Sequence, residues 1–366
     1  MSIINQVIIY IMVVCMALGA IDKCLGNKFG IGEKFEEGIM AMGSLALAMV
    51  GVICLAPVLA NVLGPIVTPV FNALGADPAM FAGSILANDM GGAPLAASLA
   101  QDPQAGMFSG LIIGAMMGAT IVFTIPVSLG IIEKKDHKFL ATGILAGIIT
   151  IPVGAFVGGL VAGFPAMMIL KNLVPIIIFA ILIAIGLMKA ENAMIKGFTY
   201  FGKGVVIVIT LALAAAIIEA LTGIVIIPGM NPISEGIEIV GDIAIVLAGA
   251  FPLVYIITKV FKKPLMGLGK ILGMNEIAAA GMVASLANNI PMFGMLKDMD
   301  DRGKIINVAF AVSASFVFGD HLGFTAGFNS SMIFPMIIAK LVGGITAVLL
   351  AMFIANKTLG KIEEAK

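Results

Sequence analysis

One short stretch, Leu86 to Pro94 (LANDMGGAP), constrains the fold of this chain more than any other. An asparagine, an aspartate, two glycines and a proline interrupt a long apolar run there. Each glycine costs a helix about 1 kcal/mol and the proline about 3 kcal/mol, so a helix should break beside Asn88 and Asp89. A broken backbone within a bilayer is tolerated only where protein buries it or where it lines a cavity. An ionisable residue at such a break is therefore a candidate functional residue.

A second interrupted stretch, Leu286 to Pro291 (LANNIP), follows about 200 residues later. At a shift of 198 residues, Glu37 also matches Glu235 and Leu74 matches Leu272. Interrupted apolar segments at matching positions of two halves are typical of secondary transporters and point to the binding site. We therefore predict three parts: a first repeat at residues 1–163, a connecting span and basic loop at 164–203, and a second repeat at 204–366.

The composition indicates a polytopic membrane protein. Hydrophobic residues make up 60% of the 366 positions and charged residues 11%, whereas a soluble domain carries about twice that share of charge. The net charge of zero gives no reason to expect a nucleic-acid partner. The sequence also lacks the motifs of zinc proteases, serine hydrolases and P-loop ATPases. We therefore expect no enzyme, no cofactor and no metal site, and a lipid bilayer as the surroundings.

The apolar runs predict an all-α fold with about nine spanning helices and two re-entrant helical hairpins. The hairpins fall at about 79–100 and 277–295. Glycines at four-residue intervals, such as Gly110, Gly114 and Gly118, allow neighbouring helices to approach closely. The nine spans are expected at 3–21, 38–63, 105–132, 139–163, 173–188, 205–227, 236–258, 305–327 and 331–356.

The basic residues decide between the topologies that these segments allow. All 21 lysines and arginines except Lys171 and Lys340 fall into six clusters, and the positive-inside rule places all six in the cytoplasm. Re-entrant hairpins that return to their own side satisfy this rule, whereas two fully crossing segments would leave the 134–138 cluster outside. The second repeat is then inverted relative to the first, with an external N-terminus and a cytoplasmic C-terminus. The six clusters lie at 23–34, 134–138, 189–203, 259–270, 297–304 and 357–366.

Several long motifs in the first 130 residues carry a resemblance to a known family. Residues 36–48 (EEGIMAMGSLALA), 55–63 (LAPVLANVL), 74–81 (LGADPAMF) and 86–92 (LANDMGG) resemble the bacterial ethanolamine utilisation permeases, the EutH family. The resemblance implies a protein of the bacterial inner membrane that passes ethanolamine to a cytoplasmic degradation pathway. It does not say which residues bind the substrate.

The candidate binding residues follow from the chemistry of such a substrate. Ethanolamine at neutral pH is a small cation with one hydroxyl, so its site needs an anionic or carbonyl-rich pocket and a hydrogen-bond partner for the hydroxyl. Asp89 is the first candidate for the ammonium, and Asn88, Asn288 and Asn289 are candidates for the hydroxyl. A cation–π contact would have to come from phenylalanine, since the chain has no Trp and three Tyr. The alternative is that these polar groups only cap the half-helices of the hairpins.

Five further ionisable residues within the predicted spans are candidates for a functional role. Asp320 and His321 could bind the substrate cation, relay protons or pair with each other. Asp242, Glu219 and Lys340 are candidates for gating or ion coupling. For Asp242 the alternative is a hydrated carboxylate near the membrane surface. For Glu219 and Lys340 we favour a structural ion pair between the two.

Together these features favour a facilitator or secondary transporter of ethanolamine that works by alternating access, with the substrate between the two hairpin tips. The alternative is a Na⁺- or H⁺-coupled secondary transporter of another small solute. Paired hairpins in inverted repeats are also typical of elevator-type transporters, which by analogy favours a homo-oligomer. A purely structural or sensory membrane protein fits least, because it would not need two interrupted hairpins in the middle of the membrane.

Overall fold

The computed structural model describes residues 3–364, and every regular element in this range is helical. Eight helical stretches are long and apolar enough to cross a membrane, which confirms the prediction of an all-α, polytopic membrane protein.

The first part of the chain forms α1 (Ile3–Cys24), α2 (Ile31–Ala73), α3 (Met80–Ile85), the 3-10 turn η1 (Asn88–Met90), α4 (Gly92–Leu99), α5 (Pro103–Met107), the π-helices η2 (Phe108–Gly118) and η3 (Thr120–Thr124), α6 (Ile125–Ile131), η4 (Lys134–Asp136) and α7 (His137–Val161). The rest forms α8 (Ala166–Thr222), α9 (Ile233–Leu272), α10 (Glu276–Ser285), α11 (Asn289–Met295), η5 (Leu296–Asp298), α12 (Asp301–Ala314), α13 (Asp320–Asn329), η6 (Ser330–Met332) and α14 (Ile333–Glu364).

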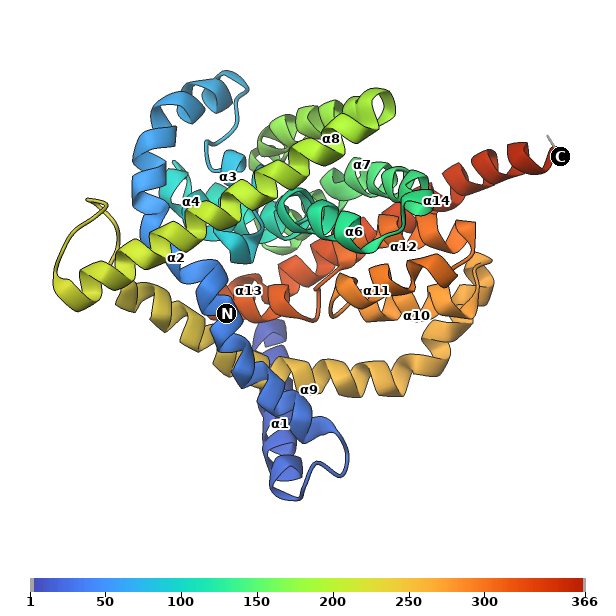
Figure 1. The fold of residues 1–366 in the computed structure, drawn as a ribbon, viewed down its shortest axis with the longest axis horizontal. Helices are drawn as coiled ribbons and strands as arrows, with labels where there is room; N and C mark the ends of the chain where they lie inside the picture. The colour runs from blue at the N-terminus through green and yellow to red at the C-terminus, as the bar shows by residue number, and fades with distance from the viewer. Residues whose placement is uncertain (1–2, 365–366) are drawn as a thin grey trace.

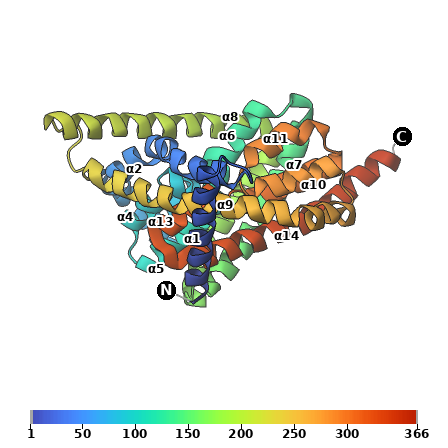
Figure 2. The same cartoon turned by 90° about the horizontal axis from the view of Figure 1, so that it is seen from below.

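The long helix α8 contains two of the predicted spans. The backbone leaves the helical region at Ala190 (φ −146°, ψ 47°), and this kink separates the two spans from each other. Figure 2 shows the second part of α8 as a long straight helix along one edge of the molecule.

The span expected at 305–327 is divided, so the prediction of one unbroken helix there was wrong. The chain leaves the helix between α12 and α13, where Phe316 takes a left-handed backbone conformation (φ 63°). The backbone N–H groups of Phe316 and Phe318 donate to the carbonyl oxygens of Ser285 and Leu286, at 3.1 and 3.0 Å. The second hairpin thus supplies hydrogen-bond partners for the interrupted helix, as an apolar environment requires.

Both predicted hairpins fold back on themselves. At the base of the first, Asp77 Oδ2 accepts hydrogen bonds from the backbone N–H groups of Gln101 and Asp102, at 3.0 and 2.8 Å. At the base of the second, Asn275 Nδ2 donates to the carbonyl oxygen of Asp298, at 3.1 Å. Each segment therefore begins and ends at one place, with α3–α4 and α10–α11 as its two arms, as expected for re-entrant hairpins.

A buried ion pair places two of the basic clusters together. Lys304 Nζ lies 2.7 Å from Asp136 Oδ1, and the two side chains are 8% and 2% exposed. The 134–138 and 297–304 clusters therefore lie on the same side of the molecule. The re-entrant topology requires this arrangement, and two fully crossing hairpins would have separated these clusters.

Elements related by the shift of 198 residues pack against each other. The most extensive contacts join α2 to α9 and α7 to α14. The spaced glycines of α7 permit the α7–α14 packing, because Gly154 and Gly158 lie against Ala339 of α14. In the view of Figure 1, α13 lies between the two hairpins. These contacts agree with two repeats, and the inversion of one repeat relative to the other stays a prediction.

Candidate functional site

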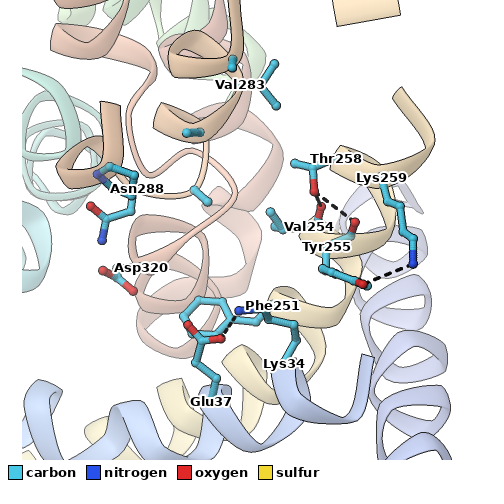
Figure 3. A pocket seen from close by; sticks show the side chains of 14 residues that line it. Lys34, Glu37, Phe251, Val254, Tyr255, Thr258, Lys259, Val283, Asn288 and Asp320 are labelled. Atoms are coloured by element: carbon cyan, nitrogen blue, oxygen red, sulfur yellow. Dashed lines mark hydrogen bonds and ion pairs between the residues drawn. The ribbon is translucent and has the colours of Figure 1, made fainter. Parts of the chain in front are cut away.

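A cavity of about 610 Å³ lies between the second hairpin, α9 and the start of α13. Asn288 at the hairpin tip and Asp320 at the start of α13 face each other across one side of it (Figure 3). Both side chains are half-buried, whereas Glu37 and Lys259, which also line the cavity, are exposed and mark its outer end. The cavity therefore leads from the surface to a carboxylate and an amide.

Two aromatic rings of α9 line the same cavity. The hydroxyl of Tyr255 donates to the carbonyl oxygen of Phe29, at 3.1 Å, and accepts from Lys259, whose Nζ lies 5.2 Å from the centre of the tyrosine ring. The ring of Tyr255 therefore already contacts the ammonium group of Lys259. Phe251 remains as the aromatic ring of this cavity that can face a bound cation, and a cation–π contact from phenylalanine stays a prediction.

Behind the cavity, three ionisable side chains from three elements form a buried triad: Asp89 of η1, His321 of α13 and Lys340 of α14. Lys340 Nζ lies 3.0 Å from His321 Nδ1 and also donates to the carbonyl oxygen of Ala115. On the other side of the ring, His321 Nε2 lies 4.0 Å from Asp89 Oδ1. Lys340 is 1% and His321 3% exposed. The triad is therefore part of the protein core.

A π-helix supports this arrangement. Ala115 belongs to η2, and π-helical turns are rare and frequent at functional sites. The glycines of η2 also pack directly on the first hairpin: Gly110 lies against Ala93, and Gly114 against the backbone of Asn88. The glycine spacing noted in the sequence thus holds the first hairpin tip against the triad.

The hairpin asparagines do not all cap helices. Asn288 caps α11, since its Oδ1 accepts from the backbone N–H of Ile290 at 2.8 Å. The same side chain also lines the cavity. Asn289 is buried and its Nδ2 donates to Thr124 Oγ1 at 3.1 Å. Asn88 is buried, forms no cap, and its amide atoms have no hydrogen-bond partner among the described residues. The capping alternative therefore holds for Asn288 alone among these three.

The remaining candidates lie apart from the cavity and the triad. Asp242 is an exposed residue of α9 and Glu219 a half-buried residue of α8. The expected ion pair between Glu219 and Lys340 was wrong, because within residues 3–364 Lys340 contacts His321 and Ala115 instead. Asp320 and His321 do not pair with each other either. Asp320 lines the cavity, whereas His321 faces Asp89.

Several members of the site were missed by sequence reasoning. Phe251, Glu37 and Thr124 lie in apolar or charged stretches that gave no sign of them. Lys340 had a signal, because it is one of two basic residues outside the six clusters, but the sequence could not name its partner. In the part of the chain that the structure describes, no three His, Cys, Asp or Glu side chains gather where a metal ion could bind.

Comparisons with known proteins give a consistent result. The family model described as "Ethanolamine utilisation protein, EutH" matches residues 4–354. A Listeria monocytogenes protein named "Probable ethanolamine permease EutH" is 70% identical over 98% of this chain and 96% of its own length. The protein of that name from Escherichia coli K12 is 53% identical over 97% of this chain and 96% of its own. "Uncharacterized protein YxeR" of Bacillus subtilis is 55% identical over 94% and 93%. No solved structure matches.

Proposed function

The chain belongs to the EutH family of ethanolamine utilisation proteins, and from this premise we propose that it carries ethanolamine across the bacterial inner membrane. The names of the relatives from Listeria and Escherichia support transport over enzymatic activity. The substrate then serves a cytoplasmic pathway that degrades it. By the positive-inside rule the N-terminus is external and the C-terminus cytoplasmic.

The observation that carries this proposal is the pairing of Asp320 with Asn288 across the cavity. A carboxylate stabilises an ammonium ion, and an amide can both donate to and accept from a hydroxyl. Phe251 adds an aromatic face. Ethanolamine presents an ammonium and a hydroxyl two carbons apart, so it can use both polar groups at once. We assign the ammonium to Asp320 and not to Asp89, because Asp89 does not line the cavity.

The position of the cavity supports alternating access. Its outer end carries Lys34 and Lys259, which belong to two of the basic clusters, so the cavity faces the cytoplasm. The matching residues of the first repeat are buried. Ala82 and Asn88, which correspond to Ala280 and Asn288 of the cavity, are 0% exposed. We assign this conformation to the inward-facing state. The outward-facing state would open the first hairpin and close the second.

Uptake of radiolabelled ethanolamine into proteoliposomes tests the proposal. We expect the purified protein to drive saturable uptake above that of protein-free vesicles. Unlabelled ethanolamine should compete best, ethylamine less because it lacks the hydroxyl, and ethylene glycol least because it lacks the charge. Absence of uptake under every imposed gradient would contradict the proposal. Uptake of a different solute that requires Na⁺ would favour the alternative of a coupled transporter for that solute.

A further inference from the structure

The buried triad has a defined hydrogen-bond direction. A lysine ammonium has three donors and no acceptor, so His321 Nδ1 accepts from Lys340 and the ring proton resides on Nε2. That proton points toward Asp89 Oδ1, 4.0 Å away. The side chain of Asp89 is 18% exposed and is the most accessible of the three. The three groups therefore lie in series, from the buried Lys340 to the more exposed Asp89, and the 4.0 Å between His321 and Asp89 is longer than a hydrogen bond.

The matching positions of the first and second repeats show that the fold does not require these charges. At the shift of 200 residues that holds from Leu86 onward, Asp89 corresponds to Asn289, His321 to Ile121 and Lys340 to Leu140. All three counterparts are neutral. The architecture thus accommodates uncharged side chains at each position, and burying three ionisable groups in only one of the two matching sets calls for a functional reason.

The groups that surround the triad are mostly uncharged, with Asp320 as the exception. The ring of Phe316 lies 5.0 Å from that of His321, and Ile243 and Leu247 of α9 pack on two glycines of α13. From η2 the contact is a backbone carbonyl, that of Ala115. On the cavity side Asp320 is the adjacent carboxylate, with Glu37 beyond it at the cavity wall. Asp320 is therefore the carboxylate that lies between the cavity and the triad, since it lines the cavity and is the chain neighbour of His321.

We propose that Asp89, His321 and Lys340 form a proton-binding site that releases one proton when an ammonium substrate binds at Asp320, so that transport exchanges ethanolammonium for a proton. This proposal rests on the proposed function. A second positive charge next to the triad disfavours the ammonium form of Lys340 in a low-dielectric core. Lys340 Nζ then gives a proton to His321 Nδ1, and the Nε2 proton passes to Asp89 when the 4.0 Å between Nε2 and Oδ1 shortens to hydrogen-bond length.

The step balances in atoms and charge. Lys340 becomes a neutral amine, His321 stays neutral with its tautomer exchanged, and Asp89 becomes a neutral acid. Asp89 then gives its proton to water. The protein has lost one positive charge and the substrate has brought one, so the charge of the complex is that of the empty protein. Transport by this cycle is electroneutral.

Calorimetric titration of the purified full-length protein in detergent tests the proposal without requiring transport. Ethanolamine hydrochloride is titrated at pH 7 in buffers of different ionisation enthalpy, and the slope of the heat against that enthalpy counts the protons released. We expect about one proton per ethanolamine for the wild type. The triple variant Asp89→Asn, His321→Phe, Lys340→Thr replaces all three groups by neutral side chains and should bind ethanolamine with no proton released. Lys171→Gln, which removes an exposed lysine of α8, should behave as the wild type.

The outcomes separate this inference from the proposed function. No heat of binding with wild-type protein would contradict the proposed function itself. Binding without proton release, or proton release that the triple variant retains, would overturn the proton site and leave ethanolamine transport standing. If the triple variant does not fold, Asp89→Asn alone supplies the comparison. Without the carboxylate of Asp89 the proton has no acceptor on its way to water, so proton release should also be lost.

Discussion

Lys340 Nζ lies 3.0 Å from His321 Nδ1 in a part of the core where the lysine is 1% exposed. An ammonium in such a place is costly unless it is hydrogen-bonded and near a counter-charge. The carbonyl oxygen of Ala115 and the imidazole ring supply the hydrogen bonds, and Asp89 supplies the counter-charge across the ring. The three side chains therefore depend on each other, which leads to the first prediction.

Replacing Lys340 alone should destabilise the protein more than neutralising the whole triad. Lys340→Met leaves Asp89 and His321 without their partner, and breaking a buried charge network in this way costs about 3–5 kcal/mol. The triple variant Asp89→Asn, His321→Phe, Lys340→Thr removes all three groups together and should recover part of that loss. Thermal unfolding in detergent compares the two, with Lys171→Gln as the control. A Lys340→Met protein as stable as the wild type would contradict the account of the triad.

The contact between Gly118 and the first hairpin should be intolerant of any side chain. A Cβ atom at Gly118 would overlap with the carbonyl group of Leu86, and that backbone cannot move without shifting the hairpin tip. We expect Gly118→Ala to lower stability by about 1–3 kcal/mol and to reduce ethanolamine uptake. Gly130→Ala is the matched control, because nothing lies within 4 Å of a Cβ atom there. Equal uptake by the two variants would argue against a fixed hairpin.

The base of the first hairpin should depend on Asp77. Its Oδ1 accepts from the backbone N–H of Ala79 at 2.8 Å, and its Oδ2 accepts from Gln101 and Asp102. Asp77→Ala removes all three bonds, and we expect a loss of about 1–2 kcal/mol, the size of a lost helix cap. Asp77→Asn keeps one carbonyl oxygen and should lose less, since Asn275 occupies the matching position at the second hairpin. Thermal unfolding of both variants provides the measurement, and an unchanged Asp77→Ala protein would refute this role.

The selectivity for a hydroxyl should depend on Asn288. Loss of one hydrogen bond to the substrate costs about 1.4 kcal/mol, or a factor of about 10 in affinity. Asn288→Ala should therefore weaken competition by ethanolamine about 10-fold and leave competition by ethylamine nearly unchanged. The measurement is inhibition of labelled ethanolamine uptake by each amine. If competition by both amines weakens by the same factor, Asn288 does not contact the hydroxyl.

Much of the architecture could be predicted from the sequence because the bilayer restricts it so strongly. Gly91, Gly92 and Pro94 predicted a broken helix beside Asn88, and the structure places α3, η1 and α4 there. The break between α12 and α13 was missed. It contains no proline, and its distorted residue is Phe316, whose conformation is imposed by hydrogen bonds from the second hairpin.

The sequence predicted which residues belong to the candidate site better than it predicted which of them contact each other. Asp89, Asp320, His321 and Lys340 were recognised because ionisable side chains are rare in membrane spans. Their grouping depends on how α13 and α14 pack around the first hairpin, which no local pattern encodes. Asp320 and His321 are neighbours in sequence, yet one faces the cavity and the other the buried triad.

The most direct test of the central claim, that ethanolamine binds at Asp320 during transport, is labelled uptake into proteoliposomes by wild type and by Asp320→Asn. The exposed acid Glu276, changed to Gln, serves as the control for loss of one carboxylate. We predict saturable uptake by the wild type and the control, and loss of uptake by Asp320→Asn while the variant remains folded by its thermal unfolding curve. Wild-type uptake that Asp320→Asn retains in full would contradict the assignment of the ammonium to Asp320.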